Sequence, residues 1–453
     1  LEAVGDDGYF QTANWLVSEA TTEGFELKIT DEGGGVTEVR GDRASLAFVA
    51  QGTTLWGVNS ALALSNAGIL KVDYDGAATA GALRPEAAGK IVLTEIPDLR
   101  REPRSRMAEV YRAQDAFLKR MEAAKAAAVI SIDRTAAASA GPAAAPARLI
   151  DPERRNKPAA SSGGARATIP FITLRGADIA KLYDALPAGE TRATISLRAP
   201  APAERPVKLR NVVGLLRGSD PALKDTYVIL SAHYDHLGVK PTGEGDRVYN
   251  GANDDGSGTV SVIELASALS TLSRRPRRSI LFMTFFGEEK GLLGSRYYGR
   301  RPLFPIGKTI AHVNLEQVGR TDDSEGPQVS TASMTGFDYS EVGAVFQAAG
   351  EATGVRVYKH PTNSDAFFSR SDNRALADQG VPAHTLGVTF EFPDYHAVGD
   401  HWEKIDYANM AKINRLVAAG LFMIADGARE PRWNEANPKT APYVKVWRER
   451  RGK

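Results

Sequence analysis

Polar residues that could bind metal ions follow several apolar segments of the chain, and the first is a histidine. His233-Tyr-Asp235-His236 comes directly after the apolar run Tyr227–Ala232. This spacing allows the imidazole of His233 to face a metal ion while the carboxylate of Asp235 orients or supports it. A lone histidine at a strand end is more often a packing residue than a ligand, so the motif needs support from elsewhere in the chain.

Two aspartates, Asp254 and Asp255, stand in the segment Asn250-Gly-Ala-Asn-Asp-Asp-Gly-Ser-Gly, directly before an apolar helical segment. Turns and helix N-caps use these residue types, so a structural role is the ordinary interpretation. The functional interpretation is a carboxylate held in a loop where it bridges two cations.

Three glutamates also follow apolar segments. Glu288 and Glu289 come after Arg278–Phe286, and Glu316 comes after Thr309–Leu315. Because neighbouring side chains diverge, one of the paired glutamates could bind a metal ion while the other faces the substrate. Surface charge is the alternative for both.

The last polar group lies in a late loop, where Pro-Asp-Tyr-His396 precedes Asp400. The chain has no cysteine, which excludes disulfides, thiolate ligands and a cysteine nucleophile. Two histidines with three or more carboxylates form a ligand set that suits a pair of divalent cations in hydrolysis. No HExxH or GxSxG sequence occurs, so the usual signatures of thermolysin-like and serine hydrolases are missing.

Strands and helices alternate after Val207, which predicts a parallel α/β sheet whose ligands bind beyond the carboxyl ends of its strands. The strands expected there are Tyr227–Ala232, Arg278–Phe286, Thr309–Leu315 and Ala383–Val388. The helices expected there are Gly258–Leu272, Tyr339–Thr353 and Tyr407–Ile424.

The first half of the chain has strands and helices but no comparable group of polar residues. The strands expected there are Ser45–Val49, Lys90–Leu93, Ala128–Ile132 and Ile169–Leu174. The helices expected there are Met107–Ala127 and Ala177–Leu186. The Ala/Pro-rich segment 135–147 and the Ser/Gly-rich segment 161–167 predict exposed loops, and the prolines of 199–206 predict a hinge.

The composition is that of an ordinary globular protein. Its 453 residues suggest two or three folding units, and its net charge of +1 gives no reason to expect nucleic acid or an anionic membrane as a partner. No apolar run is long enough to predict a membrane span. The basic segment Lys445–Lys453 predicts a solvated end, and the start at Leu1 predicts either a removed signal peptide or a late start.

The polar motifs agree in order, type and rough spacing with those of the M28 family of zinc metallopeptidases, which the region Val207 to Gly427 resembles. This family includes bacterial aminopeptidases and relatives of glutamate carboxypeptidase. The resemblance implies a zinc-exopeptidase-like α/β fold, with a mixed, mainly parallel sheet flanked by helices, and two zinc ions per chain. It places the metal ligands at His233, Asp254, Glu289, Glu316 and His396.

The resemblance also implies roles for these residues. Asp254 bridges the two zinc ions, His233 and Glu316 complete the ligands of one ion, and Glu289 and His396 complete those of the other.

The implied activity is hydrolysis of terminal peptide bonds in a peptide substrate. Glu288 is the general base that activates a zinc-bridging water, and Asp235 supports His233. An aminopeptidase is the first expectation, and a glutamate carboxypeptidase-like hydrolase is the alternative. A glutaminyl cyclase-like transferase and a non-catalytic receptor-like binding protein rank lower. Family habit implies a secreted or periplasmic location.

The domain organisation follows the same resemblance. Residues 1–42 are expected to be the N-terminal part of the catalytic domain and 43–200 an inserted, β-rich protease-associated (PA) domain. Residues 201–430 form the catalytic domain and 431–453 a C-terminal tail. The insertion is suggested by Ala88-Gly-Lys-Ile-Val-Leu and by the helix-to-strand step at 124–132. Leu1–Trp15 looks like the point where family members leave their first helix.

Two departures from the family affect specificity. Many family aminopeptidases have Asp where Glu316 stands, and relatives often have His where Asn373 forms part of the pocket wall. The remaining histidines are expected to pack or lie at the surface, and they are His236, His312, His360, His384 and His401. Two of them, His236 and His401, are expected to lie close enough to the site to touch substrate.

The sequence leaves the direction of cleavage open. An aminopeptidase needs an acidic group for the substrate's amine, for which Asp365, Asp372 or Glu391 are candidates. A carboxypeptidase needs a cation for the substrate's carboxylate, and Arg320 or Arg370 could supply it.

Overall fold

The computed structural model describes residues 9–19, 26–39, 44–48, 62–74, 85–96, 104–134, 148–150, 167–199, 203–240 and 243–451. The loops predicted at 135–147 and, but for its last residue, at 161–167 lie outside the described residues. The chain divides into two compact units. Unit 1 comprises residues 1–13 and 208–453, and unit 2 comprises 14–207.

Unit 1 is built on a mixed sheet with the strand order β20-β19-β21-β16-β12-β15-β11-β1. β12 pairs in parallel with β15 and β16, and β16 pairs in parallel with β21, whereas β11 is antiparallel to β15. The strands of this sheet are β1 (Tyr9–Glu19), β11 (Ala203–Leu216), β12 (Tyr227–His233), β15 (Ser279–Phe285), β16 (Thr309–Glu316), β19 (Thr331–Met334), β20 (Arg356–Tyr358) and β21 (Ala383–Gly387).

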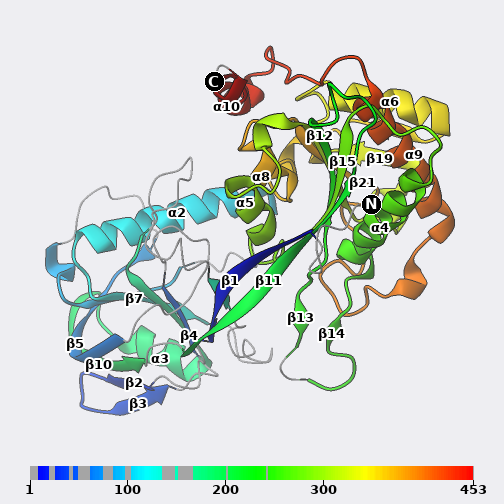
Figure 1. Ribbon diagram of the computed structural model, residues 1–453. Coiled ribbons are helices and arrows are strands. Elements are labelled where there is room, and N and C mark those ends of the chain that lie inside the picture. Colours follow the sequence, from blue (N-terminus) through cyan, green and yellow to red (C-terminus); the bar gives the residue numbers. More distant parts are fainter. Residues whose placement is uncertain are drawn as a thin grey trace. The chain divides into compact units, whose positions relative to one another are not determined.

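Helices cover both faces of this sheet (Figure 1). One group packs against the face that carries Val228 and Leu230 of β12, and the other against the face that carries Ile229. The first group is α4 (Ser257–Ser270), α6 (Val342–Thr353) and α9 (Tyr407–Asp426), and the second is α5 (Leu293–Arg300), α8 (Asn373–Ala377) and α10 (Ala441–Arg451). Because both faces are covered, the central strands β12 and β16 are buried along almost their whole length, as in other parallel sheets, although they also carry polar residues. The α/β fold expected from the sequence, a mixed and mainly parallel sheet flanked by helices, is confirmed.

The sheet brings the carboxyl ends of β12, β15 and β16 together. His233 is the last residue of β12 and Glu316 the last of β16, while Glu288 and Glu289 follow β15. Parallel pairing therefore places these residues at one edge of the sheet. α4 begins at Ser257 directly after the two aspartates and buries apolar residues at helical spacing, including Val262, Leu265 and Leu269.

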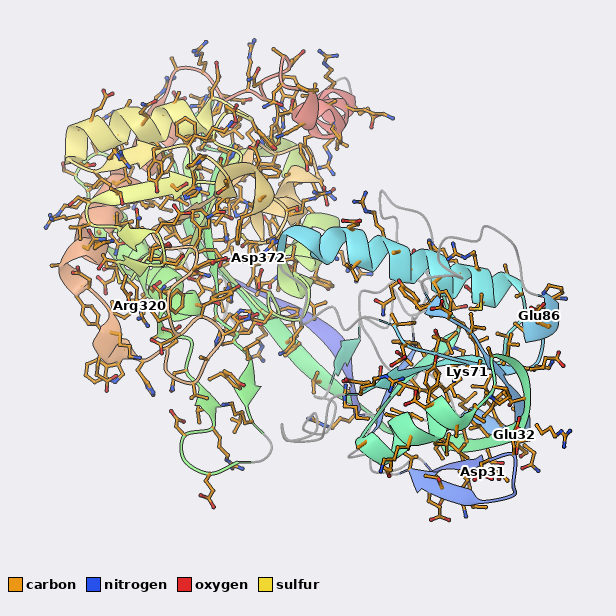
Figure 2. All side chains as sticks on the ribbon, turned by 180° about the vertical axis from the view of Figure 1, so that it is seen from behind. Asp31, Glu32, Lys71, Glu86, Arg320 and Asp372 are labelled. Atoms are coloured by element: carbon orange, nitrogen blue, oxygen red, sulfur yellow. The ribbon has the colours of Figure 1, made fainter. Side chains whose placement is uncertain are left out.

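Unit 2 has its own sheet, with the order β3-β2-β10-β5-β6-β7-β9-β4. α2 packs on one face through Phe117 and Met121, and α3 packs on the other through Ile179 and Tyr183. Lys71 donates to two carbonyls at the end of α3 (Figure 2). The elements of unit 2 are β2 (Glu26–Thr30), β3 (Val36–Val39), β4 (Ala44–Phe48), β5 (Leu62–Lys71), β6 (Ile91–Thr94), α2 (Arg104–Ala123), β7 (Ala128–Asp133), β9 (Pro170–Arg175), α3 (Ala177–Ala185) and β10 (Gly189–Ala199).

Three segments differ from expectation. Unit 2 extends beyond the predicted insertion at both ends, and residues 9–19 form strand β1 rather than the exit from a helix. Ala203–Leu216 is a continuous strand, so most of the segment predicted as a hinge is strand or strand end. Its prolines lie before the residues that pair with β15, which begin at Val212, and so do not interrupt that ladder.

The basic end predicted to be solvated lies on helix α10, where the described residues from Lys445 on are exposed or half-buried. The same helix also contains two apolar residues that are buried, Tyr443 and Val444. Tyr443 stacks on Trp433 at 5.2 Å, and Trp433 donates to the carbonyl of Gly380. Among the described residues, no helix combines the length and the hydropathy needed to cross a membrane.

A buried histidine in unit 1 predicts sensitivity to acid. His384 is fully buried, donates from Nδ1 to the carbonyl of Thr335 and accepts from the hydroxyl of Ser340. Burial lowers the pKa of His384 to about 4. The unfolded chain therefore binds more protons between about pH 6.5 and 4, and stability falls as the pH falls through this window, by about 2 kcal/mol at pH 5 from this residue.

The variant His384→Asn tests this. We expect it to be less stable than the parent at pH 7 but to lose less stability between pH 7 and pH 5, measured as the midpoint of thermal unfolding. Equal losses in the two proteins would show that His384 does not contribute to acid sensitivity.

Candidate metal centre

The first group of possible ligands is formed by His233, Asp254 and Glu316. Nε2 of His233 lies 3.3 Å from Oδ1 of Asp254 and 3.8 Å from Oε1 of Glu316. The His233 side chain is 1% exposed, and its Nε2 has no hydrogen-bond partner. A buried nitrogen that faces two carboxylates without a hydrogen bond is suited to metal binding.

The second group is formed by Asp254, Glu289 and two histidines. Nε2 of His396 lies 3.2 Å from Oδ2 of Asp254 and 3.3 Å from Oε1 of Glu289. Nδ1 of His236 lies 2.8 Å from the same oxygen of Glu289. The structure therefore brings all five predicted ligands together, and it adds a histidine that the sequence did not place among them.

Asp254 belongs to both groups, with one carboxylate oxygen in each. Oδ1 faces His233 and Oδ2 faces His396. The carboxylate is 4% exposed. This arrangement suits a carboxylate that bridges two cations, one on each side.

The donor atoms fit zinc. Ligand atoms about 2.0–2.2 Å from a common tetrahedral ion are about 3.3 Å apart, which matches the separations between Asp254, Glu289 and the two predicted histidines. Although burial opposes both shifts, the histidines lower the pKa of Glu289 to about 2 and the carboxylates raise the pKa of His396 to about 9. A site with this excess of carboxylates attracts cations.

The support of His233 differs from the prediction. Nδ1 of His233 contacts the backbone carbonyl of Asp235 at 2.9 Å, whereas the carboxylate of Asp235 lies 3.6 Å away. That carboxylate instead accepts the backbone N–H of Glu288 at 3.0 Å. Asp235 therefore fixes the imidazole through its main chain and the neighbouring glutamate through its side chain. The carbonyl sets the tautomer that leaves Nε2 free for a metal ion.

Glu288 lies beside the ligands. Burial raises its pKa well above the ordinary value, and the nearby carboxylates of Glu316, Asp372 and Glu289 act in the same direction, while His233 opposes them. Bound divalent cations would lower this pKa, because they are the largest charges in such a site.

Asp255 holds three parts of the centre together. Its carboxylate is buried and accepts backbone N–H groups from His233, Gly258 and Gln317. These belong to the end of β12, the start of α4 and the turn after β16. Its role was not predicted, because it depends on hydrogen bonds between segments that are distant in sequence.

Asp400 and Asn253 connect the remaining loops. The buried carboxylate of Asp400 accepts the backbone N–H groups of Asn253 and Asp254, and so ties Asp254 to the loop of His396. The side-chain oxygen of Asn253 accepts N–H groups of Gly319 and Arg320, each at 2.9 Å.

A directional chain of hydrogen bonds ends on Glu316. Ser231 donates to Asn314 at 2.6 Å, so Nε2 of His312, 2.7 Å from the Ser231 hydroxyl, must donate to it. Asn314 donates to the hydroxyl of Ser371 at 2.7 Å, and Ser371 donates to Glu316. The chain fixes one carboxylate oxygen and leaves the glutamate oriented towards His233.

The variant Ser371→Ala removes the last of these bonds. We expect its affinity for zinc to fall by about 10–100-fold, the usual cost of losing a group that orients a ligand. Competition with a chelator measures this. Ser340→Ala, which removes a buried hydroxyl bonded to His384, is the matched control and should bind zinc normally. Unchanged affinity in Ser371→Ala would contradict the role of the chain.

Several other candidates are occupied elsewhere. The side chain of Arg320 is 3% exposed and is paired with Asp322 and Asp394. Asp365 is paired with Lys439. Asp372 is fully buried and accepts from Ser295. Arg320 and Asp372 both lie within unit 1 (Figure 2).

The other candidates have packing or surface positions. Arg370 is exposed and lies over the ring of Phe367, and Glu391 is half-buried. Asn373 is buried, donates to the carbonyl of Phe368 and accepts from Thr385, so it joins two segments of the fold rather than lining an open wall.

The histidines left over from the predicted ligand set have different surroundings. His312 and His384 are buried, and His360 contacts Glu325 at 2.8 Å. His401 is half-buried and lies 3.3 Å from Asp246. His236 is the exception, because it joins the second group of ligands.

The chain is similar to known proteins along part of its length. Residues 211–421 match the profile of peptidase family M28. The chain is similar to a probable zinc metalloprotease of Pyricularia oryzae, with 35% identity over 208 residues that cover 44% of this chain and 39% of the relative. It is also similar to the probable leucine aminopeptidase 2 of Arthroderma benhamiae, with 26% identity over 258 residues that cover 51% and 47%. The chain thus spans less than half the length of these curated relatives.

Two solved structures share the fold. An aminopeptidase from Aneurinibacillus sp. strain AM-1 aligns with a TM-score of 0.56 and 19% identity, covering 94% of this chain and 84% of that one. A zinc aminopeptidase from Bacillus subtilis aligns with a TM-score of 0.50 and 20% identity, covering 91% and 84%.

Proposed function

Since residues 211–421 match the profile of peptidase family M28, we propose that the protein is a two-zinc exopeptidase that removes residues from the amino ends of peptides. The observation that carries this proposal is the position of Asp254. Each of its carboxylate oxygens faces a different histidine, with Glu316 beside one and Glu289 beside the other.

The chain's own residues would hold the ions and move the proton. Bound zinc supplies Lewis acidity that polarises a substrate carbonyl and lowers the pKa of water. Glu288 takes the proton of the attacking water and delivers it to the leaving amine. The bond from its backbone N–H to Asp235 holds it next to the ligands during both transfers.

Aminopeptidase activity is favoured over carboxypeptidase activity by the state of Arg320. A carboxypeptidase needs a cation that is free to bind the substrate's carboxylate. Arg320 is buried and already bonded to two carboxylates, and Arg370 is exposed and lies over an aromatic ring. One of the relatives is also named as a leucine aminopeptidase.

A panel of substrates tests the proposal. Aminoacyl-nitroanilides should be hydrolysed, and N-blocked dipeptides with a free carboxylate should not, with activity lost on chelation and restored by zinc. Preference for the blocked dipeptides would favour the glutamate carboxypeptidase-like alternative. Cyclisation of an N-terminal glutamine would favour the glutaminyl cyclase-like one, and binding without turnover a receptor-like role.

Two further expectations belong to the same proposal. We propose that unit 2 is a PA-like domain, supported by its separate sheet and by its position in the chain before the metal centre. A secreted or periplasmic location is proposed from family habit alone, and fractionation of cells that express the complete gene tests it.

A further inference from the structure

His236 lies in the second group of ligands although neither its position in the sequence nor the family resemblance assigns it there. Its side chain is 7% exposed, and Nδ1 lies 2.8 Å from Oε1 of Glu289. Neither ring nitrogen of His236 has a hydrogen-bond partner, and neither does that oxygen. A buried imidazole costs free energy when its nitrogens make no hydrogen bond, so the close approach to Glu289 calls for a further partner.

Possible metal-binding atoms of His236, Asp254 and Glu289 converge on one point. Donor atoms of His236, Asp254 and Glu289 lie within 4.8 Å of one another. Nε2 of His396 is 3.3 Å from the same oxygen of Glu289, and the two imidazole rings are 5.7 Å apart, edge to face. Two imidazoles and two carboxylates thus surround the same space.

The backbone near the bridging aspartate leaves room for this ring. Gly251 has a φ of 62°, and a Cβ at that position would come within 2.6 Å of the His236 ring. A residue with a side chain would therefore push the imidazole away from Glu289. The loop before Asp254 and the ring of His236 are fitted to each other.

We propose that His236 is a direct ligand of the second metal ion, together with Asp254, Glu289 and His396. The second ion then has two imidazole ligands and the first has one, from His233. The proposal rests on the two-zinc function proposed above, and it makes the two ions chemically different. The second site, with more protein ligands, holds its ion more tightly than a site without His236 would.

X-ray absorption of the zinc-loaded protein tests this without relying on activity. Three histidine ligands shared by two ions give an average of about 1.5 imidazoles per zinc, whereas two give about 1.0. We expect the higher value in the parent and the lower one in His236→Ala loaded at high zinc concentration. A value of 1.0 in the parent would overturn the proposal.

Zinc titration of the same variants provides an independent readout. His236→Ala should retain one tight ion, and its second should bind at least about 100-fold more weakly, beyond the effect of losing a merely orienting group. His401→Ala, which removes a half-buried imidazole that contacts Asp246, should bind zinc as the parent does. Unchanged second-site affinity in His236→Ala would overturn the proposal, whereas fewer than two ions in the parent would instead overturn the proposed function.

Discussion

Glu288→Gln should retain two zinc ions and lose about 10²–10⁴-fold in kcat, the usual contribution of a general base. Glutamine keeps the size and the hydrogen-bonding oxygen of the side chain but cannot accept the proton of the attacking water. Glu288 is not one of the residues whose donor atoms converge on a metal position, so zinc binding should not change. The measurements are kcat on an aminoacyl-nitroanilide and the zinc content per chain.

Two controls separate catalysis from metal loss in this experiment. Glu289→Gln alters the adjacent carboxylate and should lose zinc from the second site. Glu288→Gln should therefore lose activity with its zinc retained, whereas Glu289→Gln should lose zinc. Glu264→Gln, on the exposed face of α4, should behave as the parent does. Near-normal turnover in Glu288→Gln would remove this residue from the mechanism.

Asp254→Asn should have the largest effect on metal binding of any single substitution in the centre. An asparagine offers one oxygen where the aspartate offers two, and it removes a negative charge from between the two groups of ligands. We expect at most one tightly bound ion per chain and a loss of activity of about 10³-fold or more, because the Lewis acidity of a lost ion is worth several kcal/mol. Metal analysis after dialysis and nitroanilide hydrolysis measure the two effects.

The matched control for this substitution is Asp255→Asn. Asp255 is equally buried next to Asp254, but its carboxylate accepts three backbone N–H groups, among them that of His233. Its variant should be less stable, yet any folded fraction should bind two ions. Two tight ions in folded Asp254→Asn would contradict the bridging role.

Parts of the fold could be predicted because the pattern of apolar residues in the sequence indicates which segments are buried. β12 and β16 carry apolar residues on both of their faces because both faces of the sheet are covered, and α9 repeats its apolar residues at helical spacing. β11 and α10 were missed because proline and charge dominate their composition. Their structure depends on partners elsewhere in the chain, on β15 for the strand and on the aromatic cluster around Trp433 for the helix.

The metal centre also has residues that could be predicted from the sequence and residues that could not. Motifs at strand ends account for His233, Glu289 and Glu316, since a carboxyl-end position in a parallel sheet has a known location, whereas the full set with Asp254 and His396 was implied by the family resemblance. The carboxylates of Asp255 and Asp400 were not assigned, because their bonds to backbone N–H groups exist only after distant loops have met. His396 and Gln317 adopt positive φ values of 55° and 53°, which residue type alone did not indicate.

The most direct test of the two-metal centre is the titration of zinc-free protein with zinc while nitroanilide hydrolysis is recorded. We expect two tight ions per chain, activity that reaches its plateau at the second equivalent, and loss of that plateau in Asp254→Asn. Full activity with one equivalent, or in the absence of zinc, would contradict it.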